Sequence, residues 1–179
     1  MSDTLITVIA VFMAAILMFV FPLMAISDTQ DDIAQVAVQS LVSEFVNNAV
    51  TKGKITKDDY NSFRTKLFAT GNTYDIQLEH KIMTVNPNKG TNDQLGENLY
   101  YSVFNNTILS TTNGLNDSSA NNEYILKKGD YFVCTVKNTN TTLASQIKNF
   151  LYSIVGKDTY TIAGTSSGLV INTGLRYAE

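Results

Sequence analysis

One uncharged stretch of 22 residues, Leu5 to Ile26, constrains this chain more than any other feature. Its only polar side chain is that of Thr7. As an α-helix the stretch would be roughly 33 Å long at about 1.5 Å per residue, enough to cross the ~30 Å hydrocarbon core of a bilayer. A helix that is apolar on every side needs lipid or protein all around it. We therefore expect it either to lie in a membrane or to pack against further copies of the chain.

The same stretch has one feature of a cleaved signal peptide, because Ala25-Ile26-Ser27 loosely fits the small-x-small pattern of a cleavage site. Two features favour retention instead. Residues Met1 to Thr4 carry no Lys or Arg, and the apolar run exceeds the roughly 7–15 residues typical of a signal peptide. We expect the helix to remain on the mature protein, with the rest of the chain outside the cell.

The composition of the remaining chain argues against several classes of function. Charged residues make up 16% of the 179 residues, below the usual share of about a quarter, and the formal net charge is −3. Low charge with abundant Asn and Thr is typical of an extracellular, β-rich surface. No nucleic-acid partner is expected, since that would require a basic patch. With Cys134 as the single cysteine, no internal disulfide can form.

Residues Ile33 to Val50 continue the apolar helix as an amphipathic one. Apolar side chains fall on one face, which consists of Val38, Leu41, Val42, Phe45 and Ala49. This face is wide for a helix that covers a single sheet. Either all of it is covered by the chain's own head, or part of it meets a neighbouring subunit. Between the two helical parts, Asp28 and Asp31 have capping-box-like spacing, which predicts that a second helix starts there.

The helical part is predicted to end at Gly53, a suitable C-cap residue. This divides the chain into an N-terminal helix, residues 1–52, and a head domain, residues 53–179. The head begins with a short helix from Asp58 to about Ala69, whose N-terminal turn follows Thr56.

The head then shows the patterns of an antiparallel sheet. Strict alternation from Tyr74 to Ile82 predicts a half-buried strand and places His80 on its inward face. Further elements are predicted as a strand or short helix at Leu99–Leu109, two strands within Tyr124–Val136, a helix at Thr142–Val155, and strands at Thr159–Ala163 and Leu169–Thr173. The fold class is α+β: a long N-terminal apolar helix that continues as an amphipathic helix, then a small head with an antiparallel sheet of about four or five strands and one or two covering helices.

The sequence contains no catalytic motif in the structural context that the motif requires. Gly164 to Gly168 matches G-x-S-x-G literally, but that motif requires a strand-to-helix turn and a later histidine, and the only histidine is His80. The stretch is interpreted as a hairpin loop between the last two strands. The sequence contains no P-loop, HExxH or CxxC pattern. We therefore predict that the protein is not an enzyme and holds no cofactor and no metal.

The order of a short tail, an apolar helix, its amphipathic continuation and an α+β head resembles the type IV pilin-like proteins, including the TadE-like pseudopilins. The resemblance implies a filament with the apolar helices in its core and the heads facing solvent. Pilins carry a Glu near the start of the helix, whereas residues 4–26 here contain no acid. Asp3 either takes the role of that Glu, pairing with a neighbour's terminal ammonium, or simply favours the helix N-terminus.

The sequence therefore predicts a structural subunit of an extracellular pilus-like filament, a homo-oligomer that forms through the N-terminal helix and whose subunits are anchored in the membrane before assembly. The alternative is a single-pass membrane-anchored component of a secretion or conjugation apparatus, with a partner-binding head outside the cytoplasm. The residues predicted to mediate self-assembly are Leu5, Ile9, Phe12, Ile16, Phe19, Leu23, Val38, Leu41 and Phe45.

Overall fold

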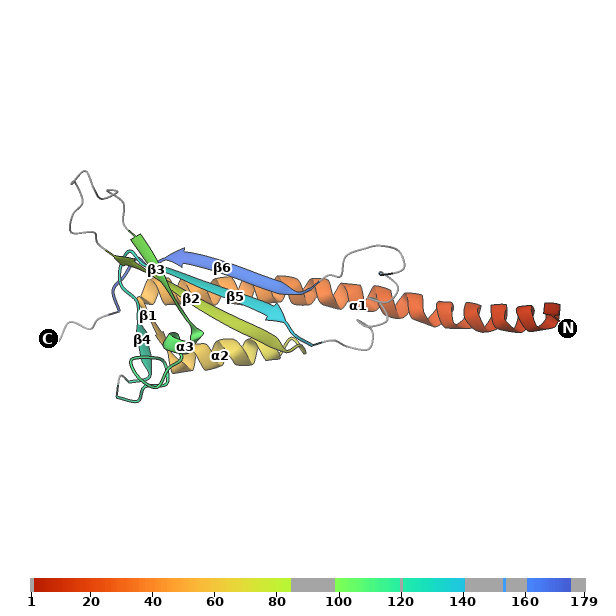
Figure 1. Cartoon of the computed structure of the whole chain (residues 1–179), viewed down its shortest axis with the longest axis horizontal. Coiled ribbons are helices and arrows are strands. Elements are labelled where there is room, and N and C mark those ends of the chain that lie inside the picture. The colour runs from red at the N-terminus through yellow and green to blue at the C-terminus, as the bar shows by residue number, and fades with distance from the viewer. Residues whose placement is uncertain (1, 85–98, 120, 141–152, 154–160, 175–179) are drawn as a thin grey trace.

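The computed structural model describes residues 2–84, 99–119, 121–140, 153 and 161–174. In chain order the elements are α1 (Ser2–Lys52), β1 (Lys54–Thr56), α2 (Lys57–Phe68), β2 (Tyr74–Thr84), β3 (Leu99–Phe104), α3 (Asn105–Ile108), β4 (Glu123–Ile125), β5 (Tyr131–Asn138) and β6 (Ala163–Leu169). The first half of α1 projects away from a small head, and its second half runs along that head (Figure 1). The α+β class predicted from the sequence is confirmed.

The head is built on a four-stranded antiparallel sheet with the strand order β3-β2-β5-β6. The alternation predicted in β2 is confirmed: Tyr74, Ile76, Leu78 and His80 are buried, while Asp75 and Gln77 are exposed. From β5, Phe132, Cys134 and Val136 join the same inner face. Alternate side chains of a strand point to opposite faces, so one face of the sheet carries the apolar core.

The second half of α1 and helix α2 cover this inner face (Figure 1). Val38, Val42 and Val46 of α1 are fully buried. The ring of Phe45 stacks on that of Phe63 from α2, with centroids 4.4 Å apart, and meets the edge of Phe132 at 6.0 Å. The core therefore joins helix and sheet. The second half of α1 therefore contributes residues to the same core as the sheet and α2.

Helix α1 is continuous through residues 27–32, so the predicted second helix start at Asp28 is wrong. A capping box stabilises a helix end only where the chain leaves helical geometry, and here the chain stays helical on both sides of the two aspartates. The predicted end at Gly53 is confirmed, since this residue has a φ of 68° and its N–H donates to the carbonyl of Ala49 at 2.9 Å. Thr56 caps α2 by accepting from the N–H of Asp59 at 3.1 Å.

The hairpin loop predicted at Gly164–Gly168 is wrong, because these residues form the centre of strand β6. A side chain in place of Gly164 would have its Cβ 3.0 Å from Val38 Cγ1, and at Gly168 it would lie 3.1 Å from Val50 Cγ1. The two glycines therefore let α1 approach the strand closely. In a sequence, a stretch rich in Gly and Ser often predicts a turn. Here the two glycines instead leave room for the helix to contact the strand.

The two strands predicted within Tyr124–Val136 exist, but they belong to different sheets. β5 lies in the main sheet, whereas β4 pairs antiparallel with β1 in a separate two-stranded sheet. Leu99–Leu109, for which strand and helix were both open, contains a strand followed by one helical turn. The helix predicted at Thr142–Val155 lies outside the described residues except for residue 153.

Candidate functional site: the exposed half of helix α1

The first half of α1 presents its apolar side chains on the surface of the molecule. Nothing in the most apolar 18-residue window of the helix is buried. Within the described residues one helix is long and apolar enough to cross a membrane, and it is this one. Monomeric soluble proteins rarely expose a contiguous apolar area of this kind. The segment is therefore a candidate membrane span or association surface.

The one polar side chain between Leu5 and Ile26 is satisfied within the helix. The hydroxyl of Thr7 donates to the backbone carbonyl of Asp3 at 2.8 Å, so it is satisfied inside the helix. Asp3 lies in the first turn, where a carboxylate favours the positive end of the helix dipole. In hydrocarbon polar groups must be satisfied internally, as helical hydrogen bonds do over most of Leu5–Ile26. The exception is at Pro22, which has no N–H to donate to the carbonyl of Met18.

The structure separates the nine predicted self-assembly residues into two groups. Six are exposed, namely Leu5, Ile9, Phe12, Ile16, Phe19 and Leu23. Val38 and Phe45, by contrast, are 0% and 5% exposed inside the head of the same chain, and Leu41 packs partly buried against that core. Val38 and Phe45 are therefore enclosed by the sheet and by α2 of their own chain, and the role of the nine residues in self-assembly stays a prediction.

Two glutamines, which the sequence analysis did not single out, attach α1 to the head where the exposed half ends. The Gln35 amide donates to the carbonyl of Ala163 at 2.6 Å and accepts from its N–H at 2.9 Å. Gln39 does the same at Thr165, at 3.1 and 3.3 Å. Both contacts lie on β6, an edge strand of the main sheet. In the sequence, these contacts could have been predicted from the i, i+4 spacing of two glutamines beside an apolar helix face.

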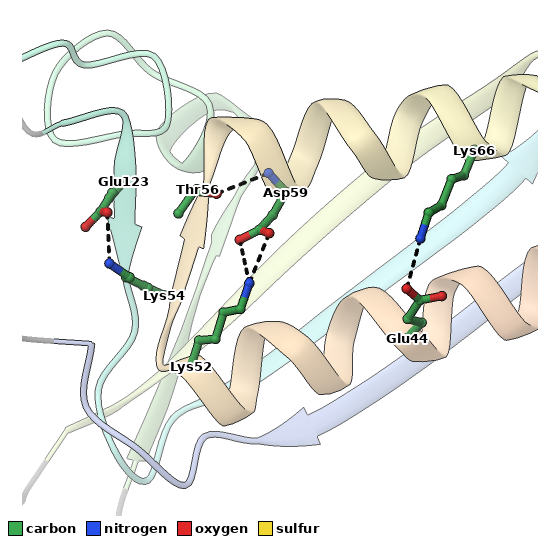
Figure 2. A network of polar contacts seen from close by, with 7 residues as sticks. All are labelled: Glu44, Lys52, Lys54, Thr56, Asp59, Lys66 and Glu123. Atoms are coloured by element: carbon green, nitrogen blue, oxygen red, sulfur yellow. Dashed lines mark hydrogen bonds and ion pairs between the residues drawn. The ribbon is translucent and has the colours of Figure 1, made fainter.

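Three ion pairs hold the other end of the head together (Figure 2). Lys52 and Lys66 pair with Asp59 and Glu44 across α1 and α2, at 3.0 and 2.9 Å. Lys54 pairs with Glu123 across β1 and β4 at 2.8 Å. Burial alone would raise the pKa of Asp59, but the hydrogen bonds from Lys52 and Thr56 hold it below its usual value. The two pairs between α1 and α2 are largely exposed and contribute little to stability, so they indicate fixed geometry rather than a binding site.

A small cavity lies beside these pairs between α1 and α2. Its volume is about 150 Å³, and Phe45, Ile55 and Phe63 are among its lining residues. Small-molecule sites usually have volumes of ≈ 300–1,000 Å³. The charged side chains around it include Glu44, Asp59 and Lys66, which are paired with one another or with Lys52. The cavity is too small, and its charges too fully paired, to suggest a ligand.

His80, Tyr124 and Asp130 form a buried polar cluster, and these residue types can act in catalysis. His80 Nε2 lies 2.8 Å from Asp130 Oδ2, and its Nδ1 lies 2.9 Å from the Tyr124 hydroxyl. Asp130 also accepts from the backbone N–H groups of Met83 and Lys127, at 2.9 and 3.1 Å. A neutral His80 that donates from Nε2 and accepts at Nδ1 satisfies every member. The cluster connects β2, β4 and the turn before β5.

Burial dominates the electrostatics of this cluster. It lowers the pKa of His80, against the opposing effect of the hydrogen bond between His80 and the accepting Asp130 carboxylate, and raises the pKa of Tyr124 to about 12. Burial likewise raises the pKa of Tyr60 and raises that of the Cys134 thiol to about 12. His80 and Asp130 are 3% and 2% exposed. Groups enclosed in this way stabilise the fold and do not meet a substrate.

Neither a metal-binding group among the described residues nor a match to a known protein points to another functional site. Among the described residues, no group of three or more His, Cys, Asp or Glu side chains could hold a metal ion. Comparison with known proteins finds no matching family model, no matching curated protein and no matching solved structure. The function proposed below therefore depends on the physical chemistry of α1.

Proposed function

We propose that this chain is a structural subunit of an extracellular pilus-like filament and that it polymerises through the first half of α1. The observation that carries the proposal is the exposure of this half, since no residue of its most apolar part is buried by the described head. Such a helix must be enclosed by lipid or by other helices. A filament satisfies both requirements in turn, with lipid before assembly and neighbouring subunits afterwards.

The energetics are sufficient for this role. Complete burial of one Leu, Ile, Val, Phe or Met side chain stabilises by about 1.5–3 kcal/mol relative to exposure in water. The exposed half carries more than ten such side chains. Relative to subunits dispersed in water, their combined burial would be worth on the order of 20 kcal/mol, more than the estimated 4–15 kcal/mol entropic cost of associating two subunits. Once bundled, the helices would not disperse into water.

The direct test is electron microscopy of sheared cell-surface material from cells that express the protein. Filaments are expected with the unaltered chain and none with Ile16→Asp, because a buried carboxylate in the helix bundle would have no partner. Asn61→Asp introduces the same carboxylate at an exposed position of α2 and should leave filaments intact. Circular dichroism and protease resistance would establish that both heads are folded. Intact filaments of the Ile16→Asp variant would contradict the proposal.

A second candidate is favoured by the same candidate span. The chain would then be a single-pass membrane-anchored component of a secretion or conjugation apparatus, with a head that binds a partner outside the cytoplasm. This function predicts extraction by detergent as a small particle and no polymer. Sedimentation of detergent extracts and of sheared surface material separates the two candidates.

A further inference from the structure

The outer edge of strand β6 is a row of backbone groups that the main sheet leaves unpaired. β6 is the last strand in the order β3-β2-β5-β6, so it pairs with β5 on one side only. In an antiparallel ladder, alternate residues of such a strand point their N–H and C=O groups away from the partner. The carbonyl of Ile162 accepts from Asn138, so the even-numbered residues face β5. The residues of β6 whose backbone groups point outward are Ala163, Thr165, Ser167 and Leu169.

Helix α1 occupies the first two outward positions with side-chain amides. Gln35 donates to the carbonyl of Ala163 at 2.6 Å and accepts from its N–H at 2.9 Å. Gln39 makes the same pair of bonds with Thr165, at 3.1 and 3.3 Å. A glutamine amide has the same kinds of donor and acceptor as a peptide group. Each glutamine therefore takes the place that a peptide group of a neighbouring strand would occupy.

The spacing of the two glutamines matches the repeat of the strand. Four residues of an α-helix rise by about 6.0 Å, and two residues of a strand span about 6.8 Å. Helix α1 runs beside β6 (Figure 1), and a Cβ at Gly164 would lie 3.0 Å from Val38 Cγ1 and 3.5 Å from Cα of Gln39. Because Gly164 has no side chain, the helix lies close enough for both glutamines to reach the strand.

Strand β6 itself carries none of the usual features that protect an edge strand. Natural edge strands are commonly protected by charged side chains, by proline or by a bulge. The seven residues of β6 read AGTSSGL, and their register with β5 is continuous, without a bulge. Beyond the strand, the N–H of Ile171 donates to the carbonyl of Val50 at 3.2 Å, so α1 holds the chain there as well. Protection of this edge therefore comes from α1.

We infer that Gln35 and Gln39 block the outer edge of β6 from pairing with a second copy of this chain. With both amides in place, Ser167 and Leu169 are the only described residues of β6 with outward groups that α1 does not bond, too short a row for a stable ladder. Without the amides the free edge covers the whole strand, which exceeds the common strand length of about 5–6 residues. A second copy presents the same uncharged strand, and two such edges can pair antiparallel.

Sedimentation of the full chain in excess detergent tests this block. Gln35→Leu combined with Gln39→Leu removes both amides at similar side-chain size and should raise the share of dimers and larger species at least fivefold. The matched control combines Gln30→Leu with Ser40→Leu, two exposed positions of α1 that do not bond to the described part of β6, and should behave as the unaltered chain. Every variant keeps the same apolar span and the same opposite edge strand, β3, so association through either is equal in all of them.

A proline in β6 identifies the edge that pairs. Thr165→Pro removes an N–H that points to Gln39 and away from β5, so the ladder with β5 is retained. Ser167→Pro removes the next outward N–H in the same way. Either change, added to the double glutamine variant, should return its association to that of the unaltered chain.

The inference does not depend on the proposed function, since the span is the same in every variant. Association of the double glutamine variant that a β6 proline abolishes supports the block. No increase over the matched control, with the head shown by circular dichroism to be folded, would overturn it. An increase that neither proline reduces would also overturn it, because the contact would then lie elsewhere. If the double variant does not fold, Gln35→Leu and Gln39→Leu are measured singly against Gln30→Leu, and no added association in either would have the same meaning.

Discussion

The two halves of α1 form one uninterrupted helix but have opposite surroundings. In the first half large apolar side chains are exposed on all sides, whereas in the second half Val38, Val42 and Val46 are fully buried. The first half is apolar all round, so a head on one side could never cover it. The second half confines its apolar residues to one face and flanks them with Gln35 and Gln39. The distribution of apolar residues around the helix, more than the overall hydrophobicity, decides whether a segment packs on its own head or leaves an apolar surface exposed.

The largest expected effect comes from replacing one phenylalanine in each half. Phe45→Ala should destabilise the head by about 3–5 kcal/mol, because it removes a ring that stacks on Phe63 in the core. Phe12→Ala should change head stability by less than about 0.5 kcal/mol, since Phe12 is exposed and distant from the core. Denaturant unfolding of both variants in the same detergent measures this. Equal losses of unfolding free energy in the two variants would show that the first half of α1 also contributes to the stability of the head.

A smaller loss is expected where the second half meets β6. Gly168→Ala would place a Cβ 3.1 Å from Val50 Cγ1, and overpacking of this kind costs about 1–3 kcal/mol. Adding Val50→Ala should recover part of the loss by making room. A double-mutant cycle on unfolding free energies tests the contact, and strictly additive losses would show that helix and strand do not press on each other there.

The two glutamine contacts should differ in strength. Gln35→Ala removes two hydrogen bonds to Ala163 at 2.6 and 2.9 Å, each worth about 0.5–1.5 kcal/mol net. Gln39→Ala removes longer bonds at a more exposed position and should cost less. Hydrogen exchange at the amides of Ala163 and Thr165 should rise in the matching variant alone. Unchanged exchange at Ala163 in Gln35→Ala would contradict this attachment of α1 to the sheet.

The smallest expected effect is a pH dependence confined to the head. Since the pKa of His80 is lower in the folded state than its ordinary 6.5, the unfolded chain binds the proton more readily. The free energy of unfolding is therefore not reduced by His80 protonation above about pH 6.5, and it falls as the pH drops below that value. Unfolding midpoints at pH 7.5 and 5.5 measure this, with His80→Gln as the control whose drop should be smaller. Greater stability at pH 5.5 would reverse the assignment.

Much of this architecture follows from local pattern. The apolar run from Leu5 to Ile26 predicts a candidate span because its length and composition leave few alternatives. Strict alternation predicts β2 and places His80 inside, and Gly53 predicts the end of α1. Each of these depends on neighbouring residues within a few turns, which is the range over which helical and strand periodicities act.

Other features depended on residues far apart in the sequence. The small residues Gly164 to Gly168 form a strand that pairs with β5 and packs against valines of α1, more than a hundred positions away. β4 pairs with β1, not with its neighbour β5, and the face containing Val38 and Phe45 is closed by the sheet and by α2. The sequence by itself determined where the chain is helical, apolar or alternating. Only the tertiary structure decided which apolar face is already occupied, because burial depends on segments that local periodicity cannot bring together.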